Sequence, residues 1–198
     1  MMLDTVERLM ATEGYASVSY RAVAAGVGVT AGLVQYYFPT LDDIFAAAIR
    51  RRAEENLDRL VSALSDRPRE PLHVLWELSR EEASAVLMTE FLALANHRKS
   101  IQAAIAEVSE RARRVQVEAL RAAGTGSAHG LSPADLAFLV NGLPKVVGLE
   151  AGAGLQATHA SVVATCERVI DQLEPPAGSA PAKRRRRSSR AVAAAPAD

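Results

Sequence analysis

The chain has 198 residues, a length that fits one or two domains and allows a substantial core. Its single cysteine, Cys166, excludes a disulfide framework, and the spread of charged residues predicts neither a signal peptide nor a membrane span. The formal net charge is zero, but residues 1–174 carry 17 basic and 22 acidic side chains, whereas residues 175–198 carry 6 basic and 1 acidic. Alanine, leucine, glutamate and arginine dominate without alternating β-branched runs, which predicts an all-α protein.

Three short helices are predicted at the start of the chain. Apolar residues recur at helical spacing over residues 2–13, and Gly14 follows as a stop signal. A second helix, capped by Ser17 or Ser19, runs to a turn near residues 26–28. Thr30 caps a third helix, which Pro39 ends.

Further helices are expected along the rest of the chain. Thr40 and Asp43 form a capping box at the start of a helix over about 41–63. The next helix lies around 72–78. Ser79, with Glu82 three residues later, is expected to open another that runs to about residue 96. The last three are expected over 99–122, 133–152 and 158–173. The sequence therefore predicts about nine helices.

The second and third helices have the layout of a helix-turn-helix. Small Ala24 lies where the two helices should cross, and Gly28 suits a turn position with positive φ. Helical spacing gives the third helix an inner side of Ala31, Val34, Tyr37 and Phe38 and an outer side of Gly32, Leu33, Gln35 and Tyr36. Glutamine pairs with adenine in the major groove, leucine contacts a thymine methyl group and tyrosine bonds a phosphate, so the outer side is expected to read DNA.

The run from Glu13 to Phe45 resembles the DNA-binding domain of the tetracycline-repressor (TetR) family. The positions in register are Gly14, Tyr15, Val23, Ala24, Gly28, Val29, Thr30, Gly32, Tyr37, Phe38, Pro39 and the acidic opening of the next helix. The resemblance implies a dimeric repressor whose C-terminal helices hold a small-molecule pocket. The outer side of the third helix and the resemblance together give the candidate DNA-binding residues Ser17, Ser19, Arg21, Thr30, Ala31, Gly32, Leu33, Gln35, Tyr36 and Tyr37.

Two positions depart from the family pattern. Family members commonly have threonine where Val18 stands, so Ser17 or Ser19 would have to supply the phosphate contact of that hydroxyl group. They commonly have tyrosine where Gln35 stands. A base-reading amide at this position implies an operator that differs from those of typical relatives.

The candidate ligand-binding residues combine apolar stripes with two polar side chains that interrupt them. They are Trp76, Met88, Glu90, Phe91, Leu94 and Asn141. Plain core packing is an alternative for each apolar residue, and pairing within the chain is an alternative for Glu90 and Asn141. If Glu90 faces the pocket, the polar end of the ligand is expected to be a donor or a cation, a preference that His97, Arg98 or Lys99 could reverse.

Apolar and small residues form continuous faces on the last two predicted helices. They include Val146, Val147, Leu149, Ala151 and Ala153, and then Ala160, Val163, Ala164 and Val169. The family resemblance implies that these helices pair with their copies in a four-helix dimer interface. Packing within one chain is the alternative.

Three parts of the chain follow from these patterns: a helix-turn-helix DNA-binding domain over 1–45, a helical effector-binding and dimerisation domain over 46–174, and a disordered basic tail over 175–198. The tail is either a second, sequence-independent DNA contact or a solubilising segment. The expected function is that of a cytoplasmic, ligand-responsive repressor. It would bind a palindromic double-stranded operator as a homodimer and leave it when a small molecule binds.

No spacing of His, Cys or carboxylate residues supports a metal or catalytic site, so neither an enzyme, a cofactor nor a membrane partner is expected. The alternative is a helical enzyme or adaptor without sequence-specific DNA binding. An acid and a base with strongly shifted pKa values in one pocket would favour an enzyme, and a positive outer face on the third helix would favour the regulator.

Overall fold

The computed structural model describes residues 1–81, 85–126 and 129–175, and the regular elements in these ranges are helical, as predicted. The helices are α1 (Met2–Glu13), α2 (Tyr20–Val27), α3 (Ala31–Tyr37), α4 (Leu41–Asp66), α5 (Pro71–Glu81), α6 (Ala85–Ala95), α7 (Lys99–Ala123), α8 (Pro133–Gly152) and α9 (His159–Leu173), with a 3₁₀ turn, η1 (Tyr15–Ser17), after α1. None of these described helices combines the length and apolar character that a bilayer-spanning segment needs. The predicted tail lies almost wholly outside the described residues.

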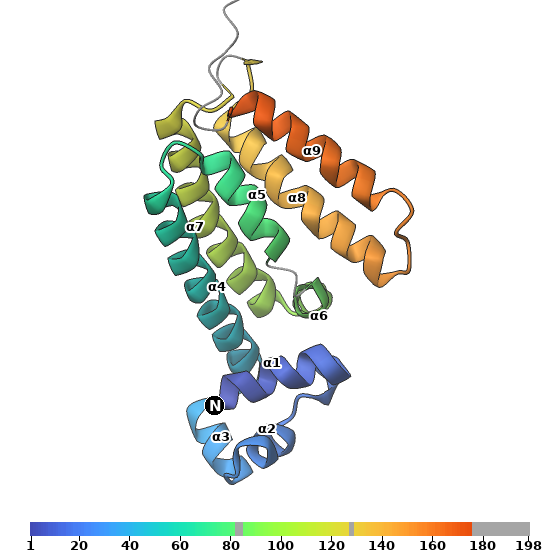
Figure 1. Cartoon of the computed structure of the whole chain (residues 1–198). Helices are drawn as coiled ribbons and strands as arrows, with labels where there is room; N and C mark the ends of the chain where they lie inside the picture. Colours follow the sequence, from blue (N-terminus) through green and yellow to red (C-terminus); the bar gives the residue numbers. More distant parts are fainter. Residues whose placement is uncertain (82–84, 127–128, 176–198) are drawn as a thin grey trace, which may run out of the picture.

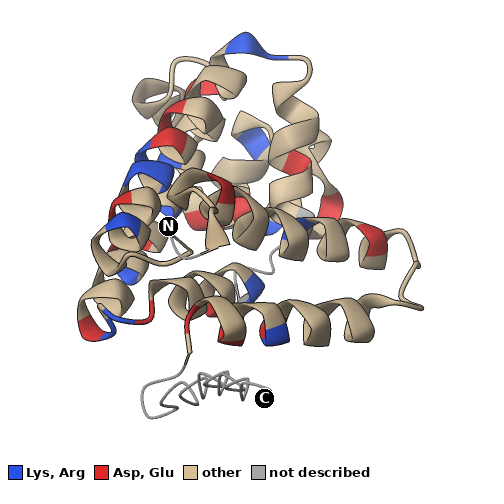
Figure 2. Ribbon diagram, turned by 90° about the horizontal axis from the view of Figure 1, so that it is seen from above, with Lys and Arg blue, Asp and Glu red and all other residues tan. Residues whose placement is uncertain are grey.

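Helices α1 to α3 form one end of the molecule, and α4 leads from this end into the larger helical body, where it packs along α7 (Figure 1). Helices α8 and α9 lie side by side on the flank away from α4, with α5 between the two groups. Basic and acidic residues are interspersed over the ribbon (Figure 2). The long helix α4 is thus a covalent link between the two ends of the molecule.

Side-chain caps fix the starts of the N-terminal helices. Ser19 and Thr30 accept hydrogen bonds from the N–H groups three residues further on, at 3.2 and 3.3 Å, and so begin α2 and α3. Thr40 and Asp43 form the predicted capping box, with reciprocal bonds of 2.9 and 3.1 Å. Each such cap is typically worth about 1 kcal/mol.

Ser79 does not cap a helix, so this prediction is wrong. It lies inside α5, where its buried hydroxyl donates to the carbonyl oxygen of Leu75 at 2.7 Å and lies 3.2 Å from that of Val140 on α8. The residue falls on the same helical stripe as Leu72, Leu75 and Trp76, which α5 turns toward the core. Since its hydroxyl bonds a carbonyl one turn earlier, a serine on this stripe fits the helix interior.

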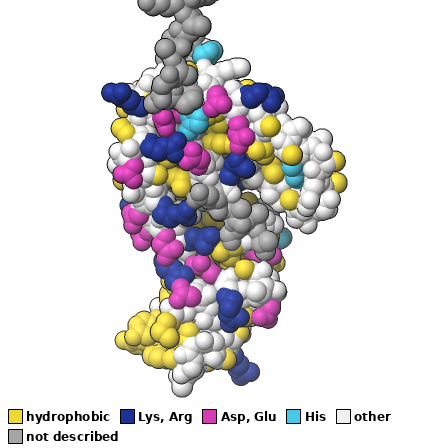
Figure 3. Space-filling view, viewed as in Figure 1, with side chains coloured by type: hydrophobic (Ala, Val, Ile, Leu, Met, Phe, Trp, Pro, Cys, Tyr) yellow, Lys and Arg dark blue, Asp and Glu magenta, His cyan; other side chains and the backbone are white. Residues whose placement is uncertain are grey.

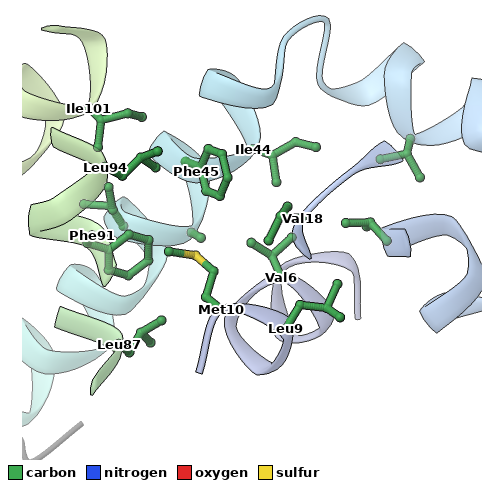
Figure 4. Close-up of a cluster of buried hydrophobic side chains, with 14 of the residues drawn as sticks. Val6, Leu9, Met10, Val18, Ile44, Phe45, Leu87, Phe91, Leu94 and Ile101 are labelled. Atoms are coloured by element: carbon green, nitrogen blue, oxygen red, sulfur yellow. The ribbon is translucent and has the colours of Figure 1, made fainter. Parts of the chain in front are cut away.

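A first cluster of buried side chains joins α1 to α4 with α6 and α7. Met10 of α1 points toward Phe91 of α6, and Phe45 of α4 lies nearby beside Leu94 (Figure 4). The fully buried members from α1, α4 and α7 include Val6, Ile44 and Ile101. A second cluster fills the space between the end of α4, α5, the end of α7, α8 and α9. The N-terminal helices therefore share one core with helices of the larger domain.

Glu174 fastens the end of α9 to the start of α5. Its carboxylate is 5% exposed and accepts hydrogen bonds from the N–H groups of Leu72 and His73 at 3.0 and 2.9 Å. It also accepts from Thr125 at 3.1 Å and contacts Nδ1 of His73 at 2.8 Å, while Nε2 of that histidine lies 3.0 Å from Asp171. Glu174 thus caps a helix that begins about one hundred residues earlier in the chain.

Helices α1 and α2 approach most tightly at Gly26. A Cβ atom added there would lie 2.4 Å from Cγ2 of Thr5, a side chain that is buried on α1. We expect Gly26→Ala to destabilise the protein, because overpacking costs about 1–3 kcal/mol, more than the gain of about 0.5–1 kcal/mol from replacing glycine in a helix.

The sign of this effect should reverse when the obstacle is removed. Thr5→Ala leaves only its Cβ, 3.5 Å from the added atom, so Gly26→Ala should stabilise the Thr5→Ala variant. Urea unfolding of the four proteins in this double-mutant cycle measures both changes. An equal cost in both backgrounds would show that Thr5 does not limit the approach of the two helices.

Candidate functional site

The outer side of α3 is open to solvent. Tyr36 is 78% exposed and Leu33 is 40% exposed, and Gln35 and Gly32 are exposed beside them, while Val34 is fully buried. Hydrophobic side chains gather over this end of the molecule (Figure 3). The predicted outer side therefore forms one accessible surface, anchored from behind by Val34.

Hydroxyl groups border this surface. The Oγ atoms of Ser19 and Thr30 accept backbone hydrogen bonds, so each hydroxyl hydrogen is still available for donation to a phosphate. Arg21 and Ala31 lie in the first turns of the same two helices, Arg21 exposed and Ala31 half-buried. Ser17 differs, because its hydroxyl donates to the carbonyl oxygen of Gly14 at 2.8 Å and holds the η1 turn.

Tyr37 does not lie on the inner side of α3, so the helical-spacing prediction for it is wrong. Its side chain is 61% exposed and meets Tyr36 edge to face, with ring centroids 5.4 Å apart. It also borders a shallow hollow with Met2 and Phe38. Phe38, which follows the end of α3, packs against the first cluster, as do Ala31 and Val34 of the predicted inner side.

Two features hold α2 and α3 at their angle, and only the first of them, Gly28, was predicted from the sequence. Gly28 ends α2 at φ 73°, the left-handed conformation that the turn was predicted to need. The hydroxyl of Tyr20 reaches across to the end of α3, 3.1 Å from the carbonyl oxygen of Phe38 and 2.9 Å from that of Pro39. Tyr20 therefore positions the exposed helix, and its long-range bonds leave no local sequence signal.

The charge of this end of the molecule is negative. Residues 1–48 contain two arginines and five acidic residues, a formal charge of −3, and α3 contains no charged residue. The positive outer face that would have favoured a regulator is thus absent from α3. Contacts from this helix to phosphates would have to come from neutral hydrogen-bond donors.

A groove lies in the larger domain between α4, α6, α7 and α8 and encloses about 190 Å³. Helix α4 contributes one face from Ile49 to Leu60, and α7 contributes one face from Ile105 to Gln116. Met88 and Phe91 come from α6, and Asn141 and Lys145 come from α8. Its floor is apolar and its polar groups come from several helices, which is the composition of a small-molecule site.

The structure brings three of the six predicted ligand-binding residues together in this groove: Met88, Phe91 and Asn141. Asn141 exchanges hydrogen bonds with Gln116, donating to its Oε1 at 3.1 Å. The other three do not line the groove. Trp76 is buried in the second cluster, Leu94 is buried in the first, and Glu90 is engaged elsewhere.

Glu90 connects α6 to the N-terminal helices. Its Oε2 accepts a hydrogen bond of 2.7 Å from the N–H group of Tyr15 in η1. A second polar link joins the starts of α4 and α7, where Asp42 accepts hydrogen bonds from Ser100 and Arg98; these bonds hold the pKa of Asp42 below its usual value. Pairing within the chain thus accounts for Glu90, and its contact joins α6 to the turn that follows α1.

The described residues hold no cluster of three or more His, Cys, Asp or Glu side chains with the grouping of a metal site. The buried polar network around Glu174 lies far from the outer side of α3, near the C-terminus of α9.

Residues 2–48 match the family described as bacterial regulatory proteins, tetR family, which agrees with the resemblance seen in the sequence. No curated protein sequence matches the chain at a significant level.

Solved structures share the fold over most of the chain. A transcriptional regulator from Saccharomonospora viridis in complex with choline has a TM-score of 0.70 and 21% identity over 86% of this chain and 93% of its own. A TetR transcription regulator from Haloarcula marismortui has a TM-score of 0.69 and 16% identity, over 87% and 94%. The multidrug binding protein EbrR, complexed with imidazole, has a TM-score of 0.58 and 28% identity, over 92% and 96%.

Proposed function

We propose that this chain, a member of the tetR family of bacterial regulatory proteins, is a cytoplasmic transcriptional repressor that binds a palindromic operator as a homodimer and releases it when a small molecule occupies the groove. The observation that carries the proposal is the exposed side of α3, with Gln35 and Tyr36 held outward by the burial of Val34. In this reading the protein acts by binding and not by catalysis.

The proposed DNA contacts divide by chemistry. Gln35 offers an amide that can pair bidentately with adenine, and Leu33 offers an apolar contact to a thymine methyl group. Ser19, Thr30 and Tyr36 offer hydroxyl groups to phosphates. Because residues 1–48 have a formal charge of −3, the basic residues 183–187 and Arg190 are proposed to supply additional phosphate contacts from the tail.

An apolar stripe supports a dimer through α8 and α9. Leu139, Val146 and Leu149 recur on α8 at helical spacing and are 51–60% exposed, and Val169 of α9 is 46% exposed. Exposed apolar patches of this kind mark association sites, and a second copy of the chain would cover them. A symmetric pair would then present two copies of α3 to two operator half-sites.

The groove shares its walls with the core beneath the DNA-binding helices. Phe91 and Ile49 line the groove and also belong to the first cluster, where Met10 and Phe45 contribute from α1 and α4. A ligand that moves these side chains would disturb packing against α1. This arrangement supports reciprocal coupling between effector and operator, typically worth about 1–3 kcal/mol. The choline and imidazole bound by two structural neighbours support small-molecule binding as part of the proposal.

Replacing Gln35 with alanine should relax the operator preference at one base pair in each half-site by about 1–3 kcal/mol, because the bidentate contact is lost. Selection from a randomised operator library, followed by titration of single-base variants, measures this change. Tyr36→Phe is the matched control and should weaken all sequences together, since its hydroxyl is assigned to a phosphate. An unchanged selected motif for Gln35→Ala would refute the assigned role.

A further inference from the structure

The charged residues that line the groove all have the same sign. Arg52 of α4, Arg113 of α7 and Lys145 of α8 converge on it from three helices, and the described lining residues include no Asp or Glu. Asn56, Ser109 and the Gln116–Asn141 pair add neutral polar groups. The lining therefore favours negative charge in whatever occupies the groove.

Apolar and basic groups occupy different depths. Ile49, Leu60 and Phe91 are buried and form the floor. Arg113 and Lys145 are exposed at the mouth, and Arg113 lies over the ring of Phe138 at 5.5 Å without a carboxylate partner among the described residues. A ligand that satisfies both layers has an apolar body pointing inward and a charged end at the opening.

The volume limits the size of that body. A cavity needs about 10–15 Å³ for each water-sized position, so a groove of about 190 Å³ holds about a dozen non-hydrogen atoms. From the lining, the depth and the volume together, we infer that the effector of the proposed regulator is a small amphipathic organic anion. Its carboxylate lies between Arg113 and Lys145 and its hydrocarbon part rests on Phe91. This inference rests on the proposed function for the role of the ligand as effector.

The expectation of a donor or cationic ligand depended on Glu90 facing the pocket, and the Glu90 carboxylate accepts from Tyr15 instead. Arg52 adds a route from the groove to the DNA-binding helices. It lines the groove and its Nη1 lies 3.5 Å from Oε2 of Glu7 on α1. A ligand body that displaces the Arg52 side chain removes one of the two guanidinium contacts of Glu7, which also pairs with Arg51 of α4 at 2.6 Å.

Isothermal titration calorimetry of the full chain without DNA tests the class of ligand. The probes are octanoate and phenylbutanoate, each compared with its own amide and amine. We expect each acid to bind about tenfold or more tightly than its amide, with the amine weakest, and we expect the affinity of the acid to fall with added salt because the mouth is exposed.

Variants locate the charge contact. Replacing Arg113 and Lys145 together with glutamine should weaken acid binding about tenfold or more and leave amide binding unchanged. The matched control replaces Arg114 and Lys99, two exposed basic residues outside the groove, with glutamine and should keep full acid affinity. Thermal melting of both double variants verifies folding.

An amine or amide that binds as tightly as its acid overturns the inference, as does an acid affinity that survives loss of both basic residues. If no acid binds, the groove is not an anion site. Operator binding is tested separately, by a gel-shift assay with DNA selected from a randomised library. If the protein binds no DNA specifically in that assay, the proposed function is wrong, but the calorimetric result on anion binding still stands.

Discussion

Replacing Glu174 with alanine is expected to lower the free energy of unfolding by about 3–5 kcal/mol, the cost of removing one partner from a buried, hydrogen-bonded charge network. The carboxylate satisfies the N–H groups of Leu72 and His73 at the start of α5 and accepts from Thr125. Its removal leaves these donors without a partner at a buried helix start, and it leaves the imidazole of His73 with Asp171 alone.

Urea unfolding followed by circular dichroism measures this loss. Glu167→Ala is the matched control on the same helix, because Glu167 forms an ion pair with Arg80 at 2.5 Å in which both side chains are nearly half exposed. Exposed pairs of this kind contribute about 0–1 kcal/mol. Equal effects of the two substitutions would mean that the Glu174 network does not hold α9 to α5.

The same network makes stability depend on pH. Burial disfavours the charged form of His73, but hydrogen bonds to Asp171 and Glu174 outweigh burial and raise the pKa of the imidazole above its ordinary 6.5. Protonation therefore stabilises the folded chain fully below about pH 6.5, and this contribution is lost as the pH rises through the raised pKa. The free energy of unfolding, measured at increasing pH from below 6.5, should therefore decline, and the His73→Gln variant should not show this decline. A decline of the same size in that variant would assign it to other groups.

A glutamate in place of Leu149 should separate the proposed dimer. The side chain is 60% exposed in the single chain and lies on the stripe with Val146 and Leu139, so a buried, unpaired charge would appear at the centre of the interface. Operator affinity should fall by about 100-fold or more, because a monomer binds one half-site alone, whereas in a dimer the binding of one copy holds the second copy beside the other half-site. Sedimentation and gel-shift titration measure the two effects.

Val61→Glu is the control for Leu149→Glu, since Val61 is an aliphatic residue, 45% exposed, on α4, a helix that lies away from α8 and α9 (Figure 1). It should keep both the oligomeric state and the operator affinity of the original chain. If the Leu149→Glu protein still sediments as a dimer and binds operator as before, the two copies associate through another surface.

Local chemistry explains which features were predictable from the sequence. The bounds of α1 and α8 agree with the prediction because helical periodicity and flanking stop or cap residues lie within a few positions of each end. Thr30 and the Thr40–Asp43 box cap their helices as expected, since the donor and acceptor are three residues apart. For the DNA-binding surface, the outward placement of Gln35 follows from the burial of Val34.

The features that were missed depend on contacts between distant residues. Glu90 reaches Tyr15 across 75 positions of sequence, and Glu174 reaches Leu72 across 102. No periodicity or spacing rule connects such pairs, and a polar residue on an apolar stripe is compatible with either a ligand or a protein partner. The three basic residues of the groove were not singled out for the same reason, since only the packing of α4, α7 and α8 brings them together.

Because Phe91 and Ile49 serve both the groove and the core beneath the DNA-binding helices, the two ends of the groove differ in how freely they can change. A substitution on the floor also changes the packing that stabilises the N-terminal helices. A substitution at Ser109, Arg113 or Lys145 on the exposed rim leaves that packing unchanged. In descendants of this chain, a change in the specificity of the proposed effector site should therefore arise first at the rim, while the apolar floor stays nearly unchanged.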